Sequence, residues 1–134
     1  MNSRELMAAA EQARRASYSP YSKFAVGAAL LTKSGRVVLG CNVENSSFGL
    51  ACCAERTAVF KAVSEGECEF VAIAVTAGAD QCSAPCGACR QVMHEFAPEL
   101  VVHFRDAHAK LVRRKLSALL PEGFRFPRKK RGAK

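Results

Sequence analysis

Three cysteines stand at the starts of two predicted helices, and they constrain the fold more than any other feature of the chain. Cys53 directly precedes a helical pattern over residues 54–65. Cys86 and Cys89 form a Cys-x-x-Cys pair at the start of a second pattern, over residues 87–96. Thiolates are good ligands for zinc, and a catalytic zinc site takes three protein ligands and keeps a fourth position open. A shared ion requires a fold that brings the two helix starts together.

The rest of the pattern predicts a layered α/β domain. Apolar periodicity predicts helices at 3–17, 54–65, 87–96 and near 114–120, and strands at 24–32, 36–41, 70–76, 100–104 and near 109–112. The turn residues Ser34 and Gly35 join the first two strands into an antiparallel hairpin. Because the later strands alternate with helices, we expect a mixed sheet with helices packed on it.

The positive charge of the chain is concentrated at its C-terminus. The formal net charge is +8, and residues 128–134 hold five positive charges and no acid, so the other residues carry only the remaining +3. This predicts one folded domain over residues 1–127, followed by a basic, flexible tail over 128–134. A weakly basic body argues against a nucleic-acid partner, although a contact between the tail and a polyanion is the alternative interpretation.

The location predicted from the sequence is the cytoplasm. The longest apolar run, residues 24–31, is far too short to span a membrane, so no membrane contact is expected. The N-terminus lacks the apolar core of a secretory signal. The chain has seven cysteines, an odd number, and in a reducing compartment these favour metal binding or buried free thiols over disulfides.

Glu55 follows Cys53 by two residues, and a proline precedes Cys86. This combination matches the signature of zinc-dependent deaminases. In such a site zinc lowers the pKa of a water molecule towards ~7, and Glu55 is expected to pass a proton from that water to ring nitrogen N3 of a pyrimidine. The alternative is that a glutamate in the first turn of a helix only complements the helix dipole.

Arg56 and Arg90 each follow a cysteine of this pattern closely. Three thiolates and one Zn²⁺ carry a net charge of −1, which makes a poor Lewis acid unless charge is drawn away from the sulfurs. Helix N-termini stabilise thiolates, and we expect both arginines to donate hydrogen bonds to sulfur. The alternative is that they pair with acids on the surface.

Five motifs are spread along the chain: YSKFAVGAALL at 21–31, GCNVEN at 40–45, CAERTA at 53–58, PCGACRQV at 85–92 and LLP at 119–121. On these motifs the chain resembles the small, homotetrameric cytidine deaminases over about residues 3–126. The resemblance implies a three-layer α/β/α sandwich with a mixed, roughly five-stranded sheet and one Zn²⁺ per subunit. It also implies hydrolytic deamination of cytidine and 2′-deoxycytidine to uridine and 2′-deoxyuridine, with release of ammonia, in pyrimidine salvage.

The same resemblance implies a substrate-binding set, which comprises Phe24, Asn42, Glu44, Phe48, Ala54 and Phe124. Asn42 and Glu44 are expected to hydrogen-bond the ribose, and Phe24 to pack against the pyrimidine. Phe124 is expected to reach the site of a neighbouring subunit in the tetramer. Without the resemblance, Asn42 and Glu44 would be interpreted as turn residues and Phe24 as a core residue.

Three other functions are compatible with parts of the pattern. A nucleic-acid-editing deaminase would need a basic groove and insertions that a chain of this length has little room for. A structural zinc module would not need Glu55. A deaminase of an aminoacyl-nucleoside antibiotic is a further alternative, but the implied ribose contacts fit a free nucleoside such as cytidine better.

Overall fold

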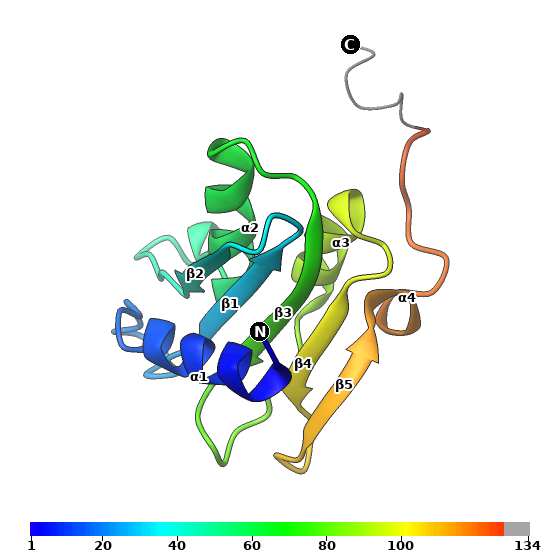
Figure 1. Cartoon of the computed structure of the whole chain (residues 1–134). Coiled ribbons are helices and arrows are strands. Elements are labelled where there is room, and N and C mark those ends of the chain that lie inside the picture. The colour runs from blue at the N-terminus through cyan, green and yellow to red at the C-terminus, as the bar shows by residue number, and fades with distance from the viewer. Residues whose placement is uncertain (128–134) are drawn as a thin grey trace.

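The computed structural model describes residues 1–127, so the predicted basic tail lies outside the described residues. The helices are α1 (Ser3–Arg14), α2 (Ala54–Ser64), α3 (Gly87–Phe96) and α4 (Leu116–Leu119), with a short 3₁₀ helix η1 (Phe48–Leu50) before α2. The strands are β1 (Gly27–Thr32), β2 (Val37–Cys41), β3 (Phe70–Thr76), β4 (Val101–Arg105) and β5 (Leu111–Lys115). Figure 1 shows these elements in the order of the chain.

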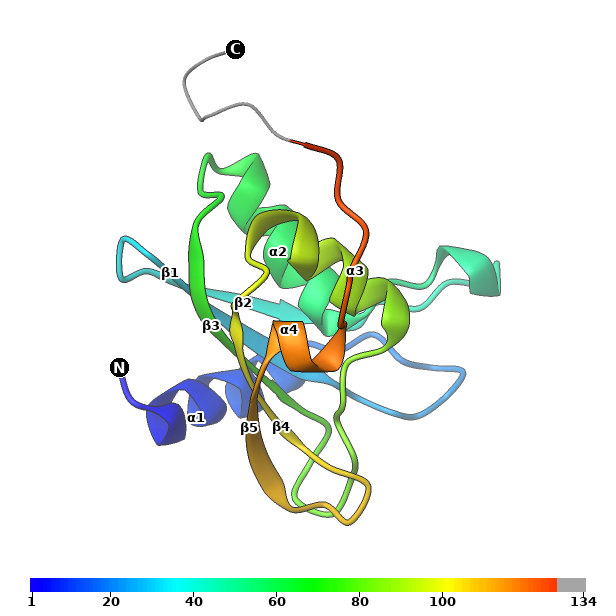
Figure 2. The same ribbon diagram turned by 90° about the vertical axis from the view of Figure 1, so that its right-hand side faces the viewer.

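The five strands form one mixed sheet in the order β2-β1-β3-β4-β5. Only β3 and β4 pair in parallel, and the other neighbours are antiparallel. Helix α1 covers one face of the sheet, and α2, α3 and α4 lie on the other (Figure 2). This confirms the expected three-layer α/β/α sandwich, with β1 and β3 buried between two layers of helices.

The two faces of the sheet have separate apolar cores. On the α1 face the core is built largely from alanines, including Ala10 on the helix and Ala74 on β3. Small side chains let α1 approach closely, and at Gly27 an added Cβ would lie 2.1 Å from the carbonyl oxygen of Ala10. On the other face larger side chains pack together, including Ile73 of β3 and Met93 of α3.

A second glycine sets the position of α2. A Cβ at Gly40 would lie 2.5 Å from both the carbonyl oxygen of Ala54 and the amide nitrogen of Ala58. The first turn of α2 therefore rests directly on the backbone of β2. This contact fixes the point at which Cys53 enters the helix.

Several predicted boundaries differ from the structure. The helix predicted over 3–17 ends at Arg14, and the last strand is Leu111–Lys115 and not 109–112. The strand predicted to begin at Phe24 begins at Gly27. The side chain of Asn42, which follows β2, bonds the backbone of the residues before Gly27. The bounds predicted for β3 and α3 match the structure. Within residues 1–127, no helix has both the length and the apolar character that crossing a membrane demands.

Candidate active site

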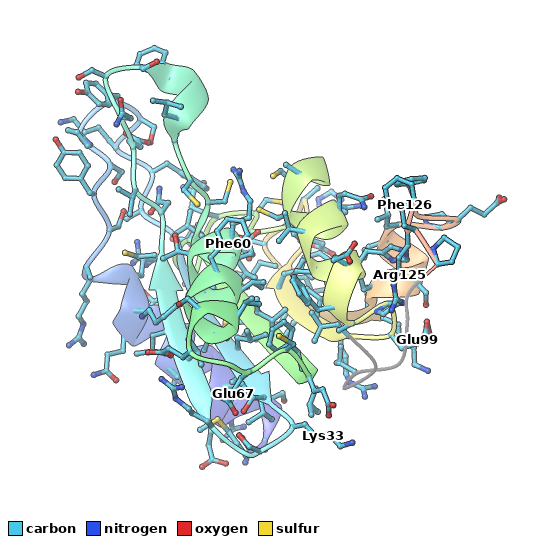
Figure 3. The ribbon with its side chains drawn as sticks, turned by 90° about the horizontal axis from the view of Figure 1, so that it is seen from above. Lys33, Phe60, Glu67, Glu99, Arg125 and Phe126 are labelled. Atoms are coloured by element: carbon cyan, nitrogen blue, oxygen red, sulfur yellow. The ribbon has the colours of Figure 1, made fainter. Side chains whose placement is uncertain are left out.

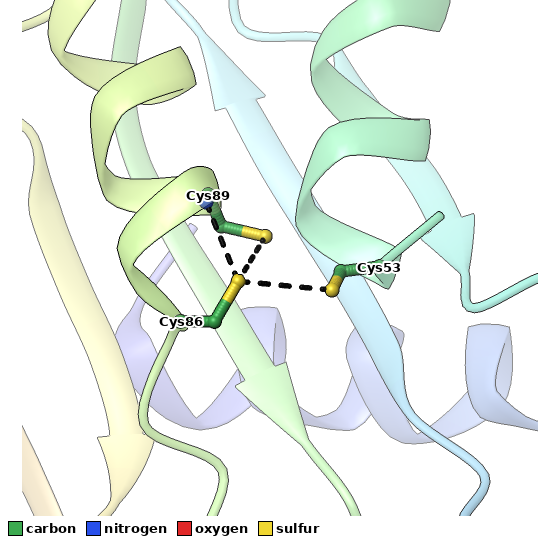
Figure 4. Close-up of side chains that lie close together, drawn as sticks. All are labelled: Cys53, Cys86 and Cys89. Carbon is green, nitrogen blue, oxygen red and sulfur yellow. Dashed lines mark hydrogen bonds between the residues drawn. The ribbon is translucent and has the colours of Figure 1, made fainter. Parts of the chain in front are cut away.

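The thiol groups of Cys53, Cys86 and Cys89 lie together at the starts of α2 and α3 (Figure 4). Cys86 Sγ is 3.8 Å from Cys53 Sγ and 3.4 Å from Cys89 Sγ, and all three sulfurs lie within 4.8 Å of one another. Sulfurs bound 2.3 Å from a tetrahedral zinc ion are about 3.8 Å apart. The cluster thus has the donor atoms and the spacing that fit a zinc ion with one coordination position left open.

Both helices present their N-termini to this cluster. Cys53 is the N-cap residue of α2, and Cys86 is that of α3. The backbone N–H of Cys89 donates to Cys86 Sγ at 3.5 Å. Unpaired N–H groups and the positive end of the helix dipole both favour thiolates over thiols at these positions.

Cys53 and Cys89 shift each other's pKa in opposite directions. Hydrogen bonds from the Cys89 thiol and, to a smaller extent, from Arg56 lower the pKa of Cys53 to about 5. Donation of its proton to Cys53, together with burial, raises the pKa of Cys89. A metal ion that binds all three as thiolates must displace the Cys89 proton, so metal binding here is coupled to proton release.

The two arginines predicted to donate to sulfur differ in what they contact. Arg56 Nη2 donates to Cys53 Sγ at 3.4 Å, and the thiolates raise the pKa of Arg56. Arg90 instead donates from Nε to the carbonyl oxygen of Pro85 and from Nη1 to that of Leu119, each at 2.8 Å. Arg90 therefore joins the segment before Cys86 to the end of α4, and it does not donate to sulfur in this structure.

Glu55 is buried in the first turn of α2, with only 4% of its surface exposed. Burial raises the pKa of its carboxyl group to about 7, and the charge on Cys53 adds to that effect. A carboxylate that merely complemented the helix dipole would remain in solvent with an ordinary pKa. A carboxyl group that is half protonated near pH 7 can both accept and donate a proton.

Asn42 fastens the loop that carries Phe24. Its Oδ1 accepts a hydrogen bond from the backbone N–H of Val26 at 2.9 Å, and its Nδ2 donates to the carbonyl oxygen of Phe24 at 2.7 Å. Both bonds use backbone groups of the segment before β1. The backbone N–H of Asn42 also donates to the carbonyl oxygen of Val26 at 3.2 Å, and the regular pairing of β1 with β2 begins at Gly27, three residues later than predicted. One Nδ2 hydrogen of Asn42 is left for another acceptor.

Glu44 anchors the same loop nearer to its tip. Its carboxylate accepts hydrogen bonds from the backbone N–H groups of Tyr21 and Ser22, at 3.0 and 3.2 Å, and from the hydroxyl of Ser22. The Ser22 hydroxyl is the main cause of a lowered pKa at Glu44. The resemblance assigns Asn42 and Glu44 to the ribose. In this structure both side chains bond the loop before β1, which agrees with their alternative interpretation as turn residues.

A hollow of about 290 Å³ lies beside this loop, lined by Tyr21, Ser22, Glu44, Asn45, Phe48 and Ala51. The rings of Tyr21 and Phe48 meet with centroids 5.7 Å apart. Of the predicted substrate-binding residues, only Glu44 and Phe48 line it. Phe24 is partly exposed outside the hollow and Ala54 is fully buried. Tyr21 was not predicted as a site residue, although its place in a Tyr-Ser-Pro-Tyr loop marks it as an aromatic group outside the core.

Phe124 lies on the outer side of α3. Gln91 Nε2 donates to its carbonyl oxygen at 2.9 Å, and its ring meets that of Phe126 edge to face at 4.9 Å. In Figure 3 the segment with Arg125 and Phe126 passes beyond α3 on the side away from Phe60 of α2. The side chain of Phe124 is 64% exposed and does not line the hollow beside Tyr21 in its own chain.

Comparisons with known proteins identify the family. The family described as "Cytidine and deoxycytidylate deaminase zinc-binding region" matches residues 1–104. The chain is also 50% identical to the cytidine deaminase of Halalkalibacterium halodurans, over 92% of this chain and 95% of that protein. The chain belongs to the cytidine deaminase family. Among solved cytidine deaminases, that of Burkholderia pseudomallei is 48% identical, with a TM-score of 0.86 over 92% of this chain and 100% of that one.

A more distant relative of this chain is named for a different substrate. The blasticidin-S deaminase of Bacillus cereus is 31% identical, over 75% of this chain and 76% of that protein.

Proposed function

We propose that this protein catalyses the zinc-dependent hydrolytic deamination of cytidine and 2′-deoxycytidine to uridine and 2′-deoxyuridine, with release of ammonia, in pyrimidine salvage. The proposal rests on one observation: the three clustered thiol groups lie at the start of α2, where Glu55 is buried in the first turn. The overall reaction balances as nucleoside plus water giving the oxo-nucleoside plus ammonia. Membership of the cytidine deaminase family supports this assignment.

Cys53, Cys86 and Cys89 would hold one Zn²⁺ per subunit, and the bound ion supplies a Lewis acid that makes water nucleophilic near neutral pH. Glu55 accepts a proton from the attacking water and delivers it to ring nitrogen N3. In a second transfer Glu55 takes the proton of the hydroxyl group now on C4 and carries it to the amino group. The C4=O bond forms as the bond to nitrogen breaks, and ammonia leaves as a neutral molecule. The raised pKa of Glu55 suits both directions of transfer.

Arg56 supports the site by drawing negative charge from Cys53 through its hydrogen bond. Arg90 supports it indirectly, because its two bonds hold the segment before Cys86 in place. Among the substrate contacts, we propose that Phe24 and Phe48 pack against the base and that Asn42 and Glu44 bind the ribose. We also propose that Ala54, in the first turn of α2, is part of the substrate-binding set.

We propose a homotetramer in which Phe124 completes the site of a neighbouring subunit. The exposure of Phe124 and of Phe48 in a single chain supports this arrangement, since large aromatic rings left in solvent favour burial in an interface. The three thiols at the site must stay reduced to bind a metal, which supports the cytoplasm as the location. We propose nucleosides and not nucleic acids as partners.

A substrate panel tests the proposal. Purified protein with measured zinc content is incubated with cytidine, deoxycytidine, CMP, single-stranded DNA and blasticidin S, and ammonia release is measured. We expect turnover of the two nucleosides and loss of turnover after zinc removal, with recovery on zinc addition. Turnover of blasticidin S alone would favour the antibiotic-deaminase alternative, and no turnover of either nucleoside by zinc-loaded protein would overturn the proposal.

A further inference from the structure

A groove of about 860 Å³ lies on the face of the sheet opposite the thiol cluster. Helix α1 crosses β1 and β3, and the ribbons of β4 and β5 extend beside it with no helix in front of them (Figure 1). The groove is bounded by α1 on one side and floored by β4 and β5, since residues of all three elements line it. It is therefore separated from the proposed active site by the sheet itself.

The pleat of the sheet places basic side chains on the floor of this groove. His103 pairs with Arg113 across β4 and β5, and Arg105 pairs with Leu111. Because alternate residues of a strand point to opposite faces, these residues share the α1 face. The residues between them on β4, Val102 and Phe104, are buried in the core on the other face.

Four guanidinium groups line the groove against one carboxylate. Arg105 and Arg113 come from the sheet, and Arg4 and Arg14 from α1. The carboxylate is that of Glu11, which is already engaged by Arg14 Nε at 2.8 Å and by the Thr76 hydroxyl at 3.1 Å.

Apart from the ion pair of Arg14 with Glu11, the guanidinium groups that line the groove have few partners among the described residues. Within residues 1–127, the guanidiniums of Arg4 and Arg113 have no acidic partner. Arg105 donates from Nη1 to the carbonyl oxygen of Ala109, but its Nε is buried with no hydrogen-bond partner among the described residues. A buried N–H without an acceptor is costly, and a shift of the Arg105 side chain towards an anion in the groove would give this donor an acceptor.

The shape and lining of the groove indicate the class of ligand. Its volume lies in the range of small-molecule sites. Guanidinium groups match the geometry of phosphate oxygens and bind them with paired hydrogen bonds. Met7 and Leu111 add an apolar part to the lining, against which an organic group can pack.

We propose that this groove binds a small organic polyphosphate, with its phosphates on the four arginines and its organic body against the apolar part of the floor. The site is separate from the deaminase reaction and would serve a ligand that is not its substrate.

A calorimetric titration of the zinc-loaded, full-length protein tests this assignment. The probes are ATP, inorganic tripolyphosphate and adenosine. We expect ATP to bind best, tripolyphosphate to bind more weakly, and adenosine not to bind measurably. Binding of adenosine as tight as that of ATP would overturn the role of the arginines, and tripolyphosphate binding as tightly as ATP would overturn the role of the apolar floor.

Two neighbouring arginines of β5 provide a matched pair of variants. Arg113→Ala removes a charge from the groove, whereas Arg114→Ala removes the same charge from the adjacent position, which pairs with Val102 and points to the other face. We expect Arg113→Ala to weaken ATP binding by about tenfold or more and Arg114→Ala to change it by less than about twofold. Equal effects of the two variants would show that net charge, including that of the basic tail, attracts the nucleotide, and would overturn the proposal.

A third variant keeps the test decisive if the sheet variants fold poorly. Arg4→Ala alters an exposed residue of the first turn of α1, where no side-chain partner within residues 1–127 is lost. We expect it to weaken ATP binding by severalfold while the melting temperature and the deaminase activity stay unchanged. Unchanged ATP binding in a folded Arg4→Ala protein would contradict the placement of the phosphates.

Discussion

Arg56 Nη2 donates a hydrogen bond to Cys53 Sγ at 3.4 Å, across one turn of α2. This bond is one of the causes of the lowered pKa of Cys53, second among the lowering contacts to that from Cys89. In metal-free protein we expect Arg56→Gln to raise the pKa of Cys53 by about 1, because the nearest positive charge is removed. The pH dependence of alkylation by iodoacetamide, followed by mass spectrometry at Cys53, measures this change.

A control for this variant is Arg36→Gln, which removes an arginine that pairs with Glu65 and Glu67 at the far end of α2. It should leave the alkylation profile of Cys53 unchanged. With zinc bound, we expect Arg56→Gln to keep the metal and to lower kcat. An unaltered alkylation profile in Arg56→Gln would remove the arginine from the electrostatics of the site.

The layered fold and the thiol cluster could be predicted because both follow from local patterns. Helix α3 and strand β3 have strong periodicity, and their predicted bounds match the structure. The meeting of Cys53 with Cys86 and Cys89 followed from their common position at helix starts. Periodicity and spacing are properties of short segments, and the sequence displays them directly.

The parts that could not be predicted depend on contacts between distant residues. Phe24 continues an apolar run, yet it lies outside β1, and its carbonyl oxygen accepts a hydrogen bond from Asn42, 18 residues away in the chain. Arg90 was expected to contact sulfur, but its nearest acceptors are carbonyl oxygens, one of them at Leu119. The basic groove arises from strand register, which a single sequence does not display. Such side-chain partners are decided by packing and not by local pattern.

Glu55→Gln should separate chemistry from metal binding. The substitution keeps the size of the side chain but removes its proton affinity, so we expect turnover to fall by about 10³-fold while zinc content stays at one ion per subunit. Zinc analysis beside steady-state kinetics measures both. Substantial turnover in the zinc-loaded variant would overturn the role of Glu55.

The same variant should change how stability depends on pH. The carboxyl pKa of about 7 in the folded protein exceeds its ordinary value of 4.5, so the folded state binds more protons between these values and loses stability as pH rises through them. Glutamine removes this loss. Urea unfolding of metal-free proteins should show that Glu55→Gln gains on the order of 3 kcal/mol relative to wild type between pH 4.5 and pH 8. An equal difference at both pH values would contradict the raised pKa.

Mixing inactive variants tests whether Phe124 acts in a neighbouring subunit. We expect Phe124→Ala to lose activity while the subunit keeps its stability, since the ring is 64% exposed in its own chain. When Phe124→Ala and Glu55→Gln subunits are dissociated and reassembled together, some sites should combine an intact Glu55 with an intact Phe124 from another chain. Ammonia release should then exceed that of either parent, and an inactive mixture would show that Phe124 acts within its own subunit.

Gly40→Ala should destabilise the protein by displacing α2. Its Cβ would lie 2.5 Å from backbone atoms of Ala54 and Ala58, which cannot move without shifting the helix. We expect a loss of about 3 kcal/mol in the free energy of unfolding, with weaker zinc retention because Cys53 precedes that turn. Gly49→Ala is the matched control, since nothing lies within 4 Å of its added Cβ. Urea titration and zinc analysis of both variants make the comparison.

Cys53 and Cys86 are separated by 33 positions in the chain, and the segment between them contains α2 and the central strand β3. An ion held by both residues would join the two ends of this segment in the folded protein. Because the three thiolates come together only in the folded chain, the free energy of metal binding would add to the free energy of folding. Removal of the metal would thus raise the fraction of unfolded chains, in which the central strand is open to proteases.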